Sequence, residues 1–102
     1  MFYKGTLTKL LDMLDEIPWN FWIYSEPFDI LKGEMQCLAL DVDAADLGGD
    51  GFTPLEVERL GFQELISIQD LNGVLKNLQL TGKDVPVLSA IDYFVRNDAY
   101  LN

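Results

Sequence analysis

Six carboxylates and three glycines lie within one stretch of the sequence, Asp41–Glu58, which contains no basic residue. Carboxylates at this density could bind a divalent cation, form an acid/base pair or dock a positively charged surface. The apolar segments on either side, Met35–Leu40 and Gly61–Ile66, are predicted strands. We therefore expect the acidic stretch to be a loop that is displayed on a folded platform.

The metal hypothesis rests on the run Asp46-Leu47-Gly48-Gly49-Asp50-Gly51, which resembles the start of an EF-hand loop. Counted from Asp46, Gly51 falls at the required glycine, but position three is Gly48 and position twelve is Val57 instead of glutamate. We therefore expect no cofactor. Calcium or magnesium binding through the 41–58 loop remains an alternative, and its candidate ligands are Asp46, Asp50, Glu56 and Glu58.

Catalytic chemistry is restricted by the absence of histidine and by the single cysteine, Cys37. This composition excludes Ser-His-Asp and Cys-His nucleophilic machinery, imidazole zinc sites, and thiolate zinc or iron–sulfur clusters. Cys37 lies in an apolar run and is predicted to be a core residue, with a reactive thiol as the alternative. Carboxylate pairs within Asp41–Glu58 leave acid/base chemistry open, but no phosphate-binding motif is present. We expect no enzymatic activity.

The net charge of −10 restricts the classes of partner that the chain is expected to bind. Negative potential disfavours nucleic acid and anionic lipid and favours cationic partners, although acidity can also serve solubility alone. An apolar content of 49% indicates a folded chain, and 102 residues suit a single compact domain over 1–102. No secretory signal or membrane span is evident, so the expected location is the cytoplasm.

Periodicity predicts the first elements of the fold. Apolar residues at helical spacing predict an amphipathic helix over Thr6–Ile17, with Thr6 as its N-cap and Pro18 at its end. Alternating aromatic and branched residues predict a strand over Trp19–Ser25. A second strand over Met35–Val42 is expected to pair antiparallel with it.

The second half of the chain is predicted to be mostly helical. Thr53-Pro54 begins a short helix that ends at Gly61, and Phe62–Ile66 is a weak third strand. Ser67 and Asp70 form a variant of the capping box, and Ile68, Leu71, Leu75 and Leu78 give the apolar stripe of a helix that ends near Gly82. Asp84-Val85-Pro86 opens the last helix. The predicted fold class is α+β: a small three-stranded, mainly antiparallel sheet with helices packed on one face, in the order α-β-β-α-β-α-α.

A resemblance to a family rests on three local patterns. These are the segment Pro18-Trp19-Asn20-Phe21-Trp22-Ile23-Tyr24, the segment Cys37-Leu38-Ala39-Leu40-Asp41 and the Leu60-Gly61 break. Together they resemble an uncharacterised family of small acidic bacterial proteins with a PWxFWIY-type aromatic strand. The resemblance spans Leu7–Leu80, and the glycine-rich insert and the last helix depart from the pattern. It implies a bacterial origin and no catalytic activity.

Charge and composition together predict a non-enzymatic binding protein whose acidic surface docks a basic protein partner. The most concrete version is an immunity protein that inhibits a cationic toxin, because complementary charge would speed association. Self-association into a homodimer through the aromatic residues is a further alternative. The predicted partner-binding residues are Asp43, Asp46, Asp50, Phe52, Glu56 and Glu58, with Phe52 as an aromatic anchor.

Overall fold

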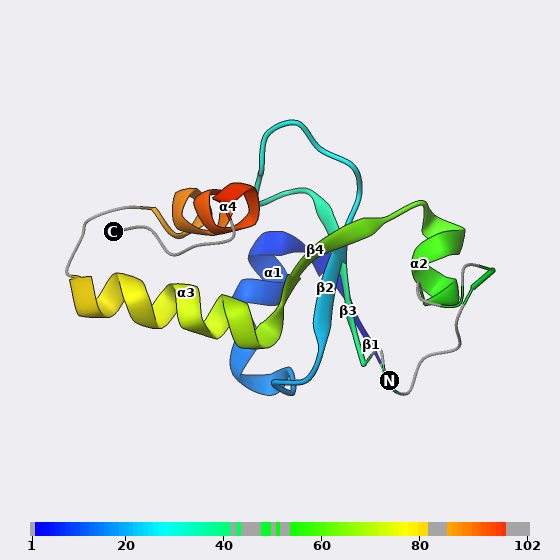
Figure 1. Cartoon of the computed structure of the whole chain (residues 1–102), viewed down its shortest axis with the longest axis horizontal. Coiled ribbons are helices and arrows are strands. Elements are labelled where there is room, and N and C mark those ends of the chain that lie inside the picture. The colour runs from blue at the N-terminus through cyan, green and yellow to red at the C-terminus, as the bar shows by residue number, and fades with distance from the viewer. Residues whose placement is uncertain are drawn as a thin grey trace.

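The computed structural model describes residues 2–41, 43, 48–49, 51, 54–81 and 86–97. Four strands form one antiparallel sheet in the order β1-β3-β2-β4 (Figure 1). No helix within these described ranges is long and apolar enough to span a membrane. The elements in chain order are β1 (Phe2–Thr6), α1 (Leu7–Asp12), the 3-10 helix η1 (Leu14–Glu16), β2 (Trp22–Ser25), β3 (Gln36–Leu40), α2 (Leu55–Leu60), β4 (Gln63–Ser67), α3 (Ile68–Thr81) and α4 (Val87–Asn97).

The sheet has four strands where the sequence predicted three. The additional strand is β1, which pairs antiparallel with β3 at the edge of the sheet. Lys4, Gly5 and Thr6 dilute its apolar pattern, so the segment carries no period-two signal. The order of elements is consequently β-α-β-β-α-β-α-α, and the predicted order α-β-β-α-β-α-α is wrong at its start.

The first predicted helix is correct at its N-terminus and wrong at its end. The Thr6 hydroxyl accepts a hydrogen bond from the Lys9 amide at 3.2 Å, which confirms the predicted N-cap. The α-helix stops before Met13, and the chain continues as η1. The apolar spacing nevertheless serves the core, because the four residues Leu7, Leu10, Leu14 and Ile17 are all buried.

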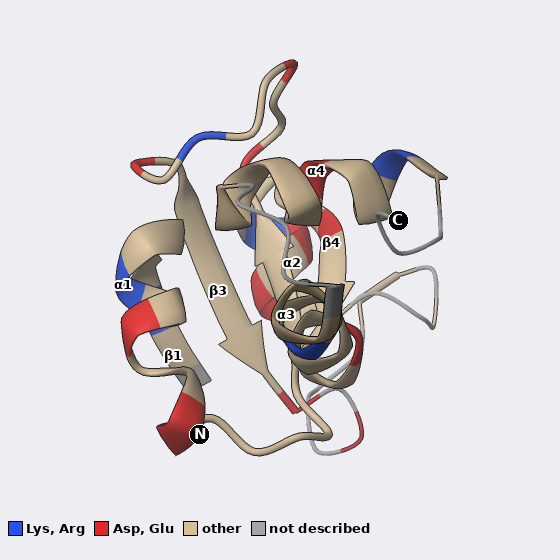
Figure 2. Cartoon of the chain, turned by 90° about the vertical axis from the view of Figure 1, so that its left-hand side faces the viewer, with Lys and Arg blue, Asp and Glu red and all other residues tan. Residues whose placement is uncertain are grey.

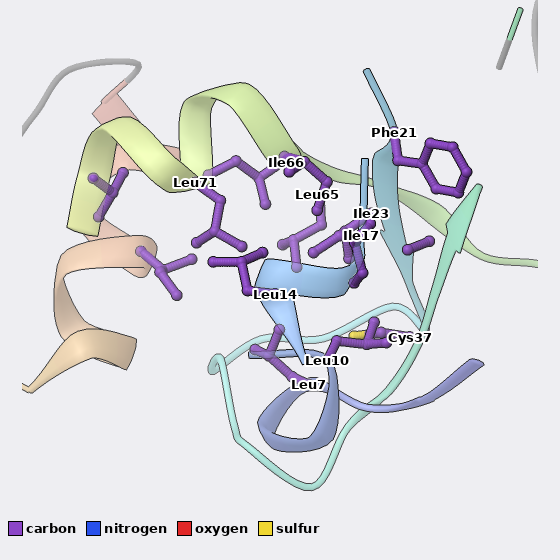
Figure 3. Packing of buried hydrophobic residues seen from close by; sticks show 14 of the residues in the cluster. Leu7, Leu10, Leu14, Ile17, Phe21, Ile23, Cys37, Leu65, Ile66 and Leu71 are labelled. Carbon is purple, nitrogen blue, oxygen red and sulfur yellow. The ribbon is translucent and has the colours of Figure 1, made fainter. Parts of the chain in front are cut away.

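One face of the sheet is covered by α1, η1, α3 and α4. Their apolar side chains surround Ile23 and Cys37, whose burial confirms the core prediction for the thiol. Figure 3 shows Leu10, Leu14 and Leu71 directed toward this common interior. The core on this face therefore joins the N-terminal helix to the C-terminal pair of helices.

The opposite face of the sheet is covered by α2. Val57 packs there against Tyr24, Leu38 and Leu40, so the prediction that all helices lie on one face is wrong (Figure 1). The reason is the composition of β2 and β3, in which apolar residues occupy both the odd-numbered and the even-numbered positions. Successive side chains of a strand point to opposite faces, so both faces of these strands must be buried. This places α2 and its carboxylates apart from the other helices.

Candidate functional site

The helix α2 is fixed to the sheet by a few residues around its acidic positions. Pro54 and Val57 are almost fully buried, whereas Glu56 and Glu58 on either side of Val57 are exposed. Gly61 ends the helix with φ of 70°, as predicted, because this left-handed conformation suits glycine. Buried residues that hold α2 on the sheet, Pro54 and Val57, thus alternate in the sequence with exposed carboxylates.

The structure describes three of the six predicted partner-binding residues. Asp43, Glu56 and Glu58 are exposed. The other three, Asp46, Asp50 and Phe52, lie outside the described residues.

Two of the exposed carboxylates make local contacts. The Glu56 carboxylate lies 3.6 Å from the Arg59 guanidinium, and both side chains are more than half exposed, so the pair contributes little to stability. Glu58 Oε2 accepts a hydrogen bond from the Gly49 amide at 3.0 Å. Glu58 therefore ties the acidic loop to α2 while it adds negative charge to the surface.

Negative charge extends beyond the predicted loop into β4 and α3. From Asp41 to Asp70 the sequence has eight carboxylates and one basic residue, Arg59. Glu64 on β4 is opposite Tyr24 in the β2–β4 register, so its side chain lies on the face covered by α2. Burial, with a further contribution from the Glu64 charge, raises the pKa of Tyr24. Figure 2 shows this acidic position on β4, together with others on α1 and in the loop between β2 and β3.

A groove of about 400 Å³ lies at the end of the sheet where β2 begins and β3 and β4 end. The register explains its composition, because Trp22 is opposite both Leu40 and Ser67. The segments that follow β3 and β4 are thereby brought beside the start of β2. The groove is lined by Trp19, Asn20, Trp22, Asp43, Ser67, Gln69 and Asp70.

Local hydrogen bonds hold the walls of this groove. The Phe21 amide donates to the Pro18 carbonyl at 3.1 Å, closing a turn that has Trp19 and Asn20 at its centre. Trp19 is 69% exposed. The Ser67 hydroxyl accepts from the Asp70 amide at 3.0 Å, which confirms the predicted cap of α3. The groove therefore combines a hydrogen-bonded turn that contains Trp19 with the capped start of α3.

Of the groove residues, only Asp43 was predicted to bind a partner. Trp19 was interpreted as part of a strand, and Asp70 as part of a capping box. The available signal was local: Pro18 followed by Asn20 is typical of a turn, and a turn would expose Trp19. Nothing in the sequence indicated that this turn would lie near Asp70.

A second groove, of about 490 Å³, follows the loop between β2 and β3. Lys32 lies in its wall together with the carboxylates Glu26, Asp29 and Glu34, so its negative charge is partly offset. The groove beside Trp19 has two carboxylates and, among the described residues, no basic residue in its lining, so both grooves have a formal charge of −2. The groove beside Trp19 differs in its two tryptophans, whose ring faces can attract a cation.

Cys37 does not have the surroundings of a catalytic nucleophile. Its side chain is fully buried, and burial, with a smaller contribution from the charge of Glu26, raises the thiol pKa to about 12. The thiol donates only a long contact of 3.8 Å to the Met35 carbonyl. At neutral pH the sulfur is consequently protonated and shielded from solvent.

Metal binding gains no support from the described residues, among which no three His, Cys, Asp or Glu side chains gather in a way that could hold an ion. Asp46 and Asp50 of the predicted ligand set are outside that part of the chain. Glu58 is engaged by the Gly49 amide. Calcium or magnesium binding therefore stays a prediction of the sequence.

A family model described as a domain of unknown function (DUF7716) matches residues 4–102. No curated protein and no solved structure matches the chain. The match agrees with the expectation of an uncharacterised family, and it covers the last helix as well as the stretch on which the resemblance rested.

Proposed function

The chain belongs to the DUF7716 family, whose function is unknown, and from its own residues we propose that it is a non-enzymatic protein that docks a basic protein partner. The docking surface is the acidic side of the molecule around α2. An immunity-type inhibitor of a cationic toxin is the most concrete version, and the bacterial origin implied by the aromatic strand fits it. The proposed contacts are Asp43, Glu56 and Glu58, together with Asp46, Asp50 and Phe52 as the sequence predicts.

The observation that carries the proposal is the excess of carboxylates in this part of the chain. Asp43, Glu56 and Glu58 are exposed, and Arg59, the one basic residue in the sequence from Asp41 to Asp70, is paired with Glu56 at 3.6 Å. Charge of one sign on one side of a protein steers oppositely charged partners and raises their association rate. It also makes that rate sensitive to salt, because exposed charges are screened by dissolved ions.

The second supporting observation is that the described carboxylates stand on a fixed element. Val57 is 1% exposed and packs against Leu38 on the sheet, so α2 is anchored between Glu56 and Glu58. A surface that is already ordered loses less conformational entropy when it binds.

The test compares two charge-neutralised triples of the full chain in affinity purification from cells that express the protein. The first triple, D43N/E56Q/E58Q, changes the acidic side. The control triple, D12N/D15N/E16Q, changes exposed carboxylates on α1 and η1, across the sheet from α2. Each removes three negative charges from the total of −10, so a difference between them reports position and not net charge.

We expect the wild type and the control triple to retain the same basic protein, identified by mass spectrometry, and the acidic-side triple to lose most of it. The amide substitutions keep an oxygen that can accept the Gly49 hydrogen bond, so the loop contact with residue 58 can persist. Equal recovery with both triples, or a retained partner of acidic isoelectric point, would refute the proposal.

Self-association is a second candidate, because several large apolar side chains are exposed. Ile30 is 69% exposed and Leu80 is 77% exposed, and Val87 and Tyr93 on α4 add to the exposed apolar surface. Light scattering of the purified chain decides this point. A mass of 11.6 kDa at every concentration would remove the candidate, whereas twice that mass would support it.

A further inference from the structure

We propose that the groove formed by Trp19, Trp22, Asp43 and Asp70 receives one arginine side chain of the basic partner. This inference rests on the proposed function and specifies it, because it names where a single partner residue binds beside Asp43, one of the proposed contacts. The groove volume of about 400 Å³ lies within the range of roughly 300–1,000 Å³ that is usual for ligand pockets.

The aromatic component of the groove is solvent-accessible. Trp19 is 69% exposed at the tip of its turn, and Trp22 is half-buried at the start of β2. An exposed tryptophan beside a hollow is typical of an interaction surface, since its large apolar area remains in contact with water in the free protein. The face of an indole ring also attracts cations through its quadrupole.

The acidic component comes from two segments that the β2–β4 and β2–β3 pairings bring together. Asp43 follows β3, and its amide donates to Asp41 Oδ1 at 3.0 Å, which fixes the backbone there. Asp70 is in the first turn of α3, where the Ser67 cap holds its backbone. Both aspartates line the groove, and Asn20 and Gln69 are further polar residues of its lining.

The combination of these groups selects a cation, and arginine in particular. No lysine or arginine of the described part of the chain lines the groove, so an entering cation would meet aspartate and tryptophan residues without a competing positive charge from those residues. A guanidinium is planar and weakly hydrated, so it can stack on an aromatic ring and donate to carboxylates at the same time. A lysine ammonium is a compact and strongly hydrated charge, and it lacks the planar stacking surface.

Intrinsic fluorescence tests the inference directly, because both tryptophans of the chain line the groove. The wild-type chain is titrated with a tri-arginine peptide at low salt, and with the matched peptide in which citrulline replaces each arginine. Citrulline keeps the size of the side chain and removes its charge. We expect a saturable change in emission with the arginine peptide, weakened by salt, and none with the citrulline peptide.

Substitutions locate the binding within the groove. D43N and D70N should each weaken the peptide affinity about fivefold, as expected for one exposed ion pair. Trp19→Leu should weaken it about threefold, as expected for one cation–π contact. The control E56Q/E58Q lies on α2 outside the groove lining and should bind the peptide with less than a twofold change. Thermal melting of each variant checks that the fold persists.

An unchanged emission with tri-arginine, equal responses to arginine and citrulline, or undiminished affinity in D43N and D70N would overturn the groove as an arginine seat. These results leave the proposed function intact, because its test is the recovery of a basic protein, and two of the three residues changed in that test, Glu56 and Glu58, lie outside the groove lining. Conversely, a normal peptide response with equal partner recovery by the two triples would refute the proposed function, and the groove would then bind arginine in the isolated chain without a part in docking.

Discussion

Single side chains on the acidic side serve both the fold and the surface charge. Glu58 accepts a hydrogen bond from the Gly49 amide, and Asp41 accepts one from the Asp43 amide, so two carboxylates hold the loop that displays them. Charge-assisted hydrogen bonds to backbone amides are stronger than neutral ones. The loop carboxylates are therefore not merely solvated groups, and part of their role is to keep neighbouring charges in position.

The pH dependence of stability should reveal the buried thiol of Cys37. An unfolded cysteine ionises near its usual pKa of about 8.5, whereas the native thiol has a pKa of about 12. Between these values the unfolded state binds fewer protons, so the free energy of unfolding falls as the pH rises, by at most about 1.4 kcal/mol per pH unit. Below pH 8 both states are protonated and the contribution is constant.

The measurement is denaturant unfolding of the wild type and of Cys37→Ala at several pH values from 8 to 11. Other titrating groups, including Tyr24 with its raised pKa, are common to both proteins and cancel in the difference. We expect the stability difference between the two proteins to shrink as the pH rises. A difference that stays constant over this range would contradict the burial of the thiol.

At the scale of elements, α2 is a short helix whose position depends on its ends. Gly61 terminates it in the left-handed region, and the Phe62 amide then donates to the Val57 carbonyl at 3.1 Å. This turn directs the chain from α2 into β4, which pairs with β2. The end of α2 therefore determines where β4 begins, and the pairing of β4 with β2 in turn places Ser67 beside Trp22 in the groove.

Gly61→Ala should destabilise the protein by about 1 kcal/mol, because an alanine at φ of 70° pays the cost of the left-handed conformation. No atom lies within 4 Å of the added Cβ, so the cost comes from the backbone and not from a clash. Gly49→Ala is the matched control, since Gly49 is not at positive φ and its added Cβ would be 4.0 Å from the nearest atom, of Glu58. Chemical denaturation compares them, and equal stability of both variants would contradict the assigned role of Gly61.

The helices and three strands could be predicted from sequence because their signals are local. The apolar stripe of α3, the Thr6 and Ser67 caps and the glycine at the end of α2 each act within a few residues. β1 could not be predicted, since it is a strand only through its pairing with β3. The groove could not be predicted either, because it depends on Trp22 lying opposite Ser67, a pairing between distant segments.

For the whole molecule, the sheet separates two surfaces of different character. α1, α3 and α4 cover one face and form the larger core, and α2, which carries the exposed Glu56 and Glu58, covers the other face (Figure 1). Val87 and Tyr93 are exposed on α4, one of the helices that cover the larger core. A partner steered by charge would approach the α2 side, and self-association through α4 would use a different surface.

The most direct test of the docking account is the association rate of the recovered basic partner as a function of salt. At low ionic strength we expect D43N/E56Q/E58Q to associate about tenfold more slowly than the wild type, because steering by the acidic side is lost. Its rate should also depend less on salt, while D12N/D15N/E16Q follows the wild type. Equal rates and equal salt dependence for the two triples would contradict the account.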